Sequence, residues 1–507
     1  MTLTRASSSP SATASRGGLG RAGGVAAGLS SVVGAGLVGL PAALLVETRD
    51  AAVVTWLVAV ALCLPMIVLF RDTVRHSPGS SDPLRTTVAA GLGRRWGDTV
   101  PLMFGMVVVV GLPVNAVVGA RSLVVATGVD VPETALVAAI LATAVVTNLV
   151  GATAGARVQQ VGVVVLGVVL VGLVGWAAVH APEPVDVIPS TATLPAVPAG
   201  VLLAFWAFVG FENLTFLARD LRSPRRDFLP VALITLALLT TLAVGLTVAV
   251  ALSTPTAEVD PVTGVVDAAA RLPLGRGVAL VVAAGVAVAI LLNALAWVRG
   301  VALVLRAAAA ERLLPGWFAG TDPAVPHRTI LLLTAGFTVT VSVLHRWPDL
   351  VVDLLAAASA VFVVIYAVCI VAYARARGPR GWALANLALL PILLWSLVDS
   401  GPRALYAVVV LGVALAVTRW RRSGSAPADL GVAAPDLVED AVGVVDRARG
   451  GAVPHGEVEP DGRAGDGRAE LLPVASRGDG TVLGDLDRPG PVGGAERDVE
   501  RAHPCEA

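Results

Sequence analysis

A carboxylate stands inside an apolar stretch of the chain. Residues 201–218 read VLLAFWAFVGFENLTFLA, and Gly210 precedes Glu212 and Asn213 in this run. An ionised carboxylate within a lipid bilayer costs roughly 3 kcal/mol on insertion scales, and such residues are functional candidates by default. The alternative interpretation is a structural ion pair between Glu212 and an arginine near the helix end, such as Arg219.

A second unusual stretch lies near the N-terminus. Residues 28–41, GLSSVVGAGLVGLP, contain four glycines and Pro41. Each glycine weakens a helix by roughly 1 kcal/mol relative to alanine, and proline removes a backbone donor. An interrupted membrane helix can present free amides to an anion such as a carboxylate. Close helix packing is the alternative, because Gly24 and Gly28 have GxxxG spacing.

The composition places both stretches in a membrane. The chain has 507 residues, of which 56% are hydrophobic and 15% charged, whereas soluble proteins have about 25% charged residues. Apolar windows predict an all-α integral membrane protein with about twelve spans: 24–45, 51–70, 100–121, 134–151, 158–179, 197–218, 229–252, 278–298, 329–344, 350–373, 382–398 and 403–418.

The two weak points occupy the first and the sixth of these spans. Matching places in two groups of five spans are typical of an inverted 5+5 repeat, in which the site lies where the interruptions meet. The sequence therefore predicts broken helices 1 and 6 around a site near the middle of the bilayer.

The distribution of arginine predicts the orientation. The loops on the side of the termini, with the termini themselves, hold 23 arginines, and the opposite loops hold 6. The positive-inside rule then places both termini in the cytoplasm. For a multi-pass membrane protein with this orientation we expect the plasma membrane.

We divide the chain into a disordered N-terminus (1–22), a membrane domain (23–420) and a disordered tail (421–507), because the polar ends cannot bury a core. Residues 423–507 carry 17 acidic and 8 basic residues.

The motifs resemble those of the amino acid–polyamine–organocation (APC) permeases. SSVVGAGLVGLP (30–41) is similar to their first-helix G-x-G motif, and FWAFVGFENLTFLARDLRSPRRDFLPVAL (205–233) to their sixth helix and the loop after it. RGVALVLRAAAAERLLPGWFAGTDPAVPHRT (299–329) resembles the end of their eighth helix. VVVVGLPVNAVVGARSL (107–123) is most similar to the bacterial exporters of methionine and branched-chain amino acids.

This resemblance implies a fold and a set of roles. The fold would be the LeuT-like inverted repeat, and the activity secondary transport of neutral aliphatic amino acids, by efflux or exchange. Glu212 would serve in proton coupling or gating, and Trp206 would stack on the substrate or gate the site. The carboxylate would bind backbone groups around Ser31, Val33, Gly34, Ala35 and Gly36. The amino group would bind at Phe205, Trp206, Phe208, Val209 and Gly210.

Three further polar residues have two interpretations each. Asn115 and Asn293 lie within spans, where an amide either lines the substrate path or bonds between helices. Arg157 begins the fifth span, a helix in which some proton-coupled relatives carry a basic residue in place of a sodium ion. Its place at the cytoplasmic edge of the span favours an interfacial anchor. Trp297 and Trp395 lie near predicted span ends, which is typical of interfacial anchors.

The sequence lacks the residue patterns that other classes of function require. The six histidines lie in loops, at span ends or in the tail, and the three cysteines have no CxxC spacing, so we expect no metal and no cofactor beyond a coupled proton. The motifs G-x-S-x-G and H-E-x-x-H do not occur, which argues against a membrane enzyme. We expect an amino acid and the bilayer as partners, no nucleic acid, and a monomer or homodimer. An uptake permease and a non-transporting sensor remain the alternatives.

Overall fold

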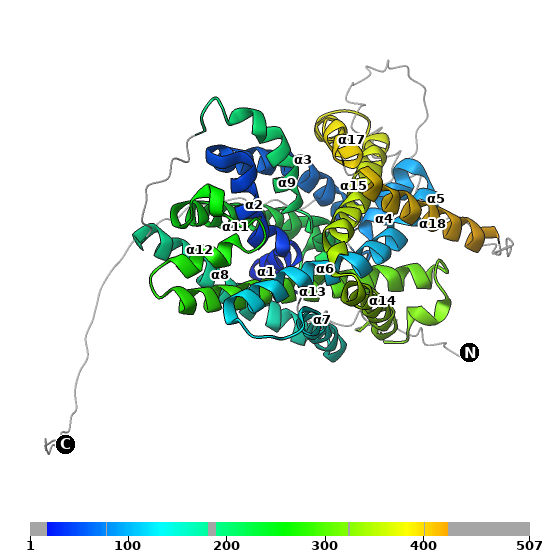
Figure 1. The fold of residues 1–507 in the computed structure, drawn as a ribbon. Helices are drawn as coiled ribbons and strands as arrows, with labels where there is room; N and C mark the ends of the chain where they lie inside the picture. The colour runs from blue at the N-terminus through cyan, green and yellow to red at the C-terminus, as the bar shows by residue number, and fades with distance from the viewer. Residues whose placement is uncertain (1–17, 78, 181–188, 323–324, 400, 424–507) are drawn as a thin grey trace, which may run out of the picture. The chain divides into compact units, whose positions relative to one another are not determined.

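The computed structural model describes residues 18–77, 79–180, 189–322, 325–399 and 401–423, and every named element in these ranges is a helix (Figure 1). The α-helices are α1 (Arg21–Val32), α2 (Ala35–Thr48), α3 (Ala52–His76), α4 (Pro83–Leu92), α5 (Arg94–Gly97), α6 (Thr99–Thr127), α7 (Glu133–Val150), α8 (Ala152–His180), α9 (Val197–Trp206), α10 (Phe211–Leu217), α11 (Pro224–Ser253), α12 (Gly264–Arg271), α13 (Gly275–Ala310), α14 (His327–Arg346), α15 (Val351–Arg377), α16 (Trp382–Leu387), α17 (Leu390–Asp399) and α18 (Ala404–Ser423). Short 3-10 helices connect them: η1 (Arg49–Ala51), η2 (Leu194–Ala196), η3 (Ala218–Asp220), η4 (Thr256–Glu258), η5 (Gly316–Ala319), η6 (Pro348–Leu350) and η7 (Gly401–Arg403).

Ten helical runs in the described residues are long and apolar enough to cross a membrane. The chain is therefore a multi-pass membrane protein. The first run, Gly36–His76, joins most of α2 to α3. By contrast, α9 and α10 have 10 and 7 residues, and each is too short to span a bilayer alone.

The predicted spans coincide with helices, and both predicted interruptions are present. The first span is divided at Val33–Gly34, between α1 and α2, and the sixth between Trp206 and Phe211. The span predicted over 382–398 corresponds to the helical run Trp382–Asp399, in which a two-residue turn at Ala388 and Leu389 separates α16 from α17. Pro391 lies in the first turn of α17, where its ring disfavours helical backbone just before it.

Glycines in α1 permit its close contact with α11. A Cβ atom at Gly24 would lie 2.9 Å from Val231 Cγ2, and one at Gly28 would lie 2.6 Å from Thr235 Oγ1. The packing interpretation of the Gly24–Gly28 pair is therefore confirmed. Gly34 and Gly36 have a different place, at the interruption itself.

Backbone and ion-pair contacts tie the start of α1 to the segment after α10. The Leu19 amide donates to the Asp220 carbonyl (2.7 Å), and the Arg222 amide donates to the Leu19 carbonyl (3.0 Å). Arg21 pairs with Asp227 of α11 (2.9 Å). Arg299 of α13 pairs with the Asp220 carboxylate (2.7 Å). The two interrupted segments are thus joined at the end where α1 begins.

Candidate functional site

The interruption after α1 leaves a carbonyl that side chains of α13 satisfy. The Ser31 carbonyl accepts hydrogen bonds from Asn293 Nδ2 (2.9 Å) and from Trp297 Nε1 (3.0 Å). Carbonyls at a helix end lack intrahelical partners, and hydrocarbon cannot supply them. Residues from a helix distant in sequence therefore stabilise the interruption.

Asn115 and Asn293 join α6 to α13 and also face the interruption. Asn115 Nδ2 donates to Asn293 Oδ1 (3.0 Å). A Cβ atom at Gly34 would lie 2.9 Å from Asn115 Nδ2 and 3.2 Å from Asn293 Cγ. The interpretation as a bond between helices is therefore confirmed. Both amides also line the space beside Gly34, and their place on a substrate path stays a prediction.

The second interruption lies directly against the first. Gly210 has φ +134°, a conformation that side chains disfavour, and a Cβ atom there would lie 2.3 Å from the Ser31 carbonyl oxygen. A Cβ atom at Gly36 would lie 2.9 Å from Ala207 Cα. Asn213 Nδ2 donates to Ser31 Oγ (3.2 Å). Glycine at these positions lets the two backbones approach.

Glu212 lies in the first turn of α10 and is fully buried. Its Oε2 atom accepts hydrogen bonds from the Gly210 amide (3.0 Å) and from the Tyr366 hydroxyl on α15 (2.7 Å). Its Oε1 atom has no hydrogen-bond partner among the described residues. Arg219 instead donates to Ser81 Oγ, so the interpretation of Glu212 as a partner of Arg219 is wrong.

A cavity of about 70 Å³ lies at the meeting point of the interruptions. Its polar lining comes from the backbone near Gly34 and Gly36 and from three side chains of α6 and α13, and its remaining wall is apolar. The lining residues are Val32, Gly34, Gly36, Val107, Val108, Gly111, Leu112, Asn115, Val209, Asn293, Trp297, Leu355, Ala358 and Phe362.

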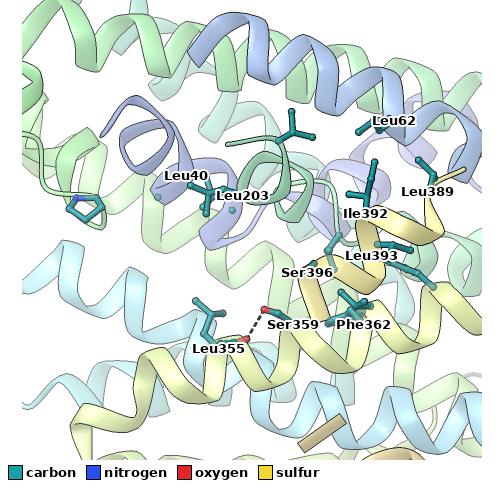
Figure 2. A pocket seen from close by; sticks show the side chains of 18 of the residues that line it. Leu40, Leu62, Leu203, Leu355, Ser359, Phe362, Leu389, Ile392, Leu393 and Ser396 are labelled. Carbon is teal, nitrogen blue, oxygen red and sulfur yellow. Dashed lines mark hydrogen bonds between the residues drawn. The ribbon is translucent and has the colours of Figure 1, made fainter. Parts of the chain in front are cut away.

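A larger cavity of about 360 Å³ adjoins it and shares Gly36, Val209, Leu355 and Phe362 with it. Figure 2 shows its aliphatic wall, to which α2, α9, α15 and α17 contribute. Ser359 Oγ is engaged with the Leu355 carbonyl (2.7 Å) rather than with the cavity. The residues lining the two cavities include none with a charged side chain.

Helix ends give the small cavity opposite partial charges on two sides. Gly34 is the N-cap of α2 and makes no side-chain cap hydrogen bond in the described structure. The amides of Ala35 and Gly36 precede the first hydrogen bond of this turn, which the Leu37 amide donates to the Gly34 carbonyl (3.2 Å), and the helix dipole places partial positive charge there. The C-terminal end of α9, at Trp206, carries partial negative charge from the helix dipole, and the interruption that follows it contributes Val209 to the lining of this cavity.

The remaining predicted residues lie in different places. Val33 is 1% exposed and packs in the core, and Phe208 packs edge-on against Trp56 with ring centroids 6.0 Å apart. Arg157 is exposed on α8 and lines neither of the two cavities. The side chains of Ala35, Phe205 and Trp206 lie outside the described part of the structure.

Three aromatic residues of the site were not predicted. The interpretation of Trp297 as an interfacial anchor is wrong, because α13 continues to Ala310 and Trp297 is buried at the site. Trp297 follows Asn293 by four residues, so helical periodicity places both on one face; this signal was available in the sequence. Phe362 and Tyr366 come from α15, and the sequence gives no local signal for them. Trp395 is exposed.

The sequence model of the amino acid permease family matches residues 22–417, and the chain belongs to this family, within the APC superfamily. Membership of this family supports amino-acid transport across a membrane.

Among curated proteins, the L-methionine/branched-chain amino acid exporter YjeH of Escherichia coli (strain K12) is 26% identical over 223 residues. The match covers 43% of this chain and 53% of the relative, so the chain spans about half the length of that protein. This similarity confirms the resemblance to the exporter subgroup.

Proposed function

We propose that the protein is a secondary active transporter that moves neutral aliphatic amino acids, such as methionine, leucine, isoleucine and valine, by alternating access. The observation that carries this proposal is the contact between two interrupted helices above a cavity with one polar side. A zwitterion fits such a cavity, because the amides at the start of α2 attract its carboxylate and the carbonyls at the end of α9 attract its ammonium group.

The apolar walls support the choice of substrate class. The side chain of the amino acid would point toward Leu112, Leu355 and Phe362. A cationic or anionic side chain would lose its hydration there without a charged partner among the lining residues, which costs several kcal/mol. The name of the exporter relative supports the same class and favours efflux or exchange, with proton-coupled uptake as the alternative. A non-transporting sensor would bind without exchange.

The proposal includes the architecture and its orientation. In this proposal the interrupted segments α1–α2 and α9–α10 count as one span each, and with the other long helices they would make twelve spans, in two inverted groups of five followed by two more. The excess of arginine places the termini in the cytoplasm of a plasma-membrane protein. On this orientation, the contacts from Leu19 to Arg222 and from Arg299 to Asp220 close the cytoplasmic end.

Glu212 supports coupling to protons. It is a fully buried acid with one unpartnered oxygen, and it is in contact with both the second interruption and α15. A buried carboxylate without a paired cation is far less costly when it is protonated. We therefore assign the coupled proton to Glu212, with Tyr366 as its hydrogen-bond donor.

The function is tested by counterflow in proteoliposomes with labelled methionine or leucine. We expect exchange of both, and arginine should not compete because the cavities offer its guanidinium no carboxylate. Competition by arginine equal to that by leucine would contradict the substrate class. Binding of leucine without any exchange would instead favour the sensor.

Replacing Glu212 with glutamine tests the coupling residue. The amide oxygen can still accept from the Tyr366 hydroxyl, but the side chain cannot bind or release a proton. We expect Glu212→Gln to retain leucine binding and to lose the stimulation of leucine transport by a pH gradient. Unchanged stimulation in this variant would remove the assignment. In the same assay, exchange by Trp206→Ala at the wild-type rate would contradict the gating role predicted for Trp206.

A further inference from the structure

One face of α15 carries a row of protonatable side chains. Tyr366, Cys369 and Tyr373 follow one another at spacings of three and four residues, so they lie on the same side of the helix. The row extends over roughly 10 Å at 1.5 Å per residue. The row begins at Tyr366, which contacts Glu212, and it runs toward the last turn of α15, which holds Arg375 and Arg377.

Acids from three other elements face this row. The Tyr366 hydroxyl donates to Glu212 Oε2 and the Tyr373 hydroxyl donates to Asp72 Oδ2, each over 2.7 Å. Between them lies the buried Cys369. Helix α4, whose N-cap is Asp82, packs against α15, with Gly91 of α4 directly against the Ala372 backbone. Asp82 thus belongs to a helix that packs along the helix carrying the row.

Asp82 is more than a helix cap. Its Oδ1 atom accepts from the Arg85 amide (3.0 Å) and caps α4. The residue is only 4% exposed, and its Oδ2 atom is buried without a hydrogen-bond partner among the described residues. A cap needs one oxygen and does not require burial of the other.

The nearby charges do not neutralise Asp82. The Arg85 guanidinium pairs with Asp98 at 2.6 Å and also with Glu311, so two other carboxylates occupy it. Burial raises the pKa of the Asp82 carboxyl to about 7, the charges of Glu311 and Asp98 add to this effect, and the amide and charge of Arg85 oppose it. Both protonation states are therefore accessible near neutral pH.

We propose that Asp82 is a second proton-binding residue of the transporter, which passes protons between Glu212 and the cytoplasmic solution along the Tyr366–Cys369 face of α15. This inference rests on the proposed proton coupling at Glu212. In the transfer a proton leaves the Glu212 carboxyl, which becomes an anion, and the Asp82 carboxylate takes one up and becomes neutral. The total charge of the two acids stays the same.

Replacing Asp82 with asparagine separates proton transfer from capping. Asparagine is as good an N-cap as aspartate but does not titrate in this range. Purified Asp82→Asn is placed in proteoliposomes with a pH-sensitive dye inside. We expect loss of leucine-driven proton movement, down to the level of liposomes without protein. Leucine exchange at equal pH, which needs no net proton transfer, should persist.

A second variant and a control make the result specific. Asp82→Ser also retains a capping oxygen and should behave in the same way if Asp82→Asn folds poorly. Asp353→Asn removes an exposed carboxylate from the other end of α15, where it pairs with Arg403 at 2.8 Å, and should leave proton movement intact.

The outcomes distinguish this inference from the proposed function. Wild-type proton movement in Asp82→Asn would overturn it, and so would loss of both exchange and proton movement in folded Asp82→Asn and Asp82→Ser. Exchange by the wild-type protein without proton movement would refute the coupling and this inference together while leaving transport intact. A wild-type protein that exchanges no amino acid would refute the proposed function itself.

Discussion

Replacing Gly210 with alanine is expected to abolish amino-acid exchange and to lower the thermal stability of the purified protein. The backbone conformation at φ +134° alone costs about 1–3 kcal/mol for a residue with a side chain. The new Cβ atom would also lie 2.3 Å from the Ser31 carbonyl oxygen, so the two interruptions must move apart. The same carbonyl accepts from Asn293 and Trp297, and their positions in the small cavity would shift with it.

Gly172→Ala provides the matched control for Gly210→Ala. Gly172 lies within α8, and a Cβ atom there meets nothing within 4 Å. Alanine within a helix is more favourable than glycine by about 1 kcal/mol, so this variant should keep its exchange activity and its melting temperature. Counterflow of labelled leucine and a thermal melt in detergent measure both effects. Full activity in Gly210→Ala would show that the contact with Ser31 is not needed for transport.

Replacing Asn293 with alanine is expected to weaken leucine binding by about 30-fold. The side chain donates to the Ser31 carbonyl at 2.9 Å and, over a longer 3.5 Å, to the Ser30 carbonyl, and it accepts from Asn115. These bonds hold the cavity lining in place before leucine binds, and a loss of about 2 kcal/mol of this preorganisation corresponds to an increase of about 30-fold in the dissociation constant. Asn115 would also lose its acceptor on α13, which leaves its orientation at the cavity less defined.

Asn148→Ala separates a binding effect from a general loss of stability. Asn148 is also a buried asparagine that bonds a carbonyl of α13, that of Leu295 at 3.1 Å, but it lines neither of the two cavities. Both variants should unfold at a lower temperature than the wild type. Only Asn293→Ala should change leucine affinity, measured by competition in the counterflow assay. An equal loss of affinity in the two variants would argue against a direct role for Asn293.

These two predictions concern the same physical feature. A membrane helix can be interrupted only where other groups satisfy its backbone, and here α13 supplies an amide and an indole to one carbonyl. The same groups line the cavity in which we propose that the substrate binds. Stability of the interruption and recognition of the amino acid therefore depend on shared residues.

The sequence by itself determined the membrane class, the helical segments and the two interruptions. These properties are local, because they depend on apolar length, on the helix propensity of glycine and on the conformation that Gly210 permits. The sequence also located Glu212, because a carboxylate in an apolar run is costly wherever the run is placed. Motif resemblance added the family, which the match over residues 22–417 confirms.

The tertiary structure decided which groups these residues meet. Glu212 accepts a hydrogen bond from Tyr366, 154 positions away, and not from nearby Arg219. Trp297 lies at the site and not at the membrane interface, because α13 runs to Ala310 and its rotation turns Trp297 toward Ser31. Partners of this kind depend on helix length, rotation and packing across the bundle. Those quantities arise from many long-range contacts together and leave no pattern within a single stretch of sequence.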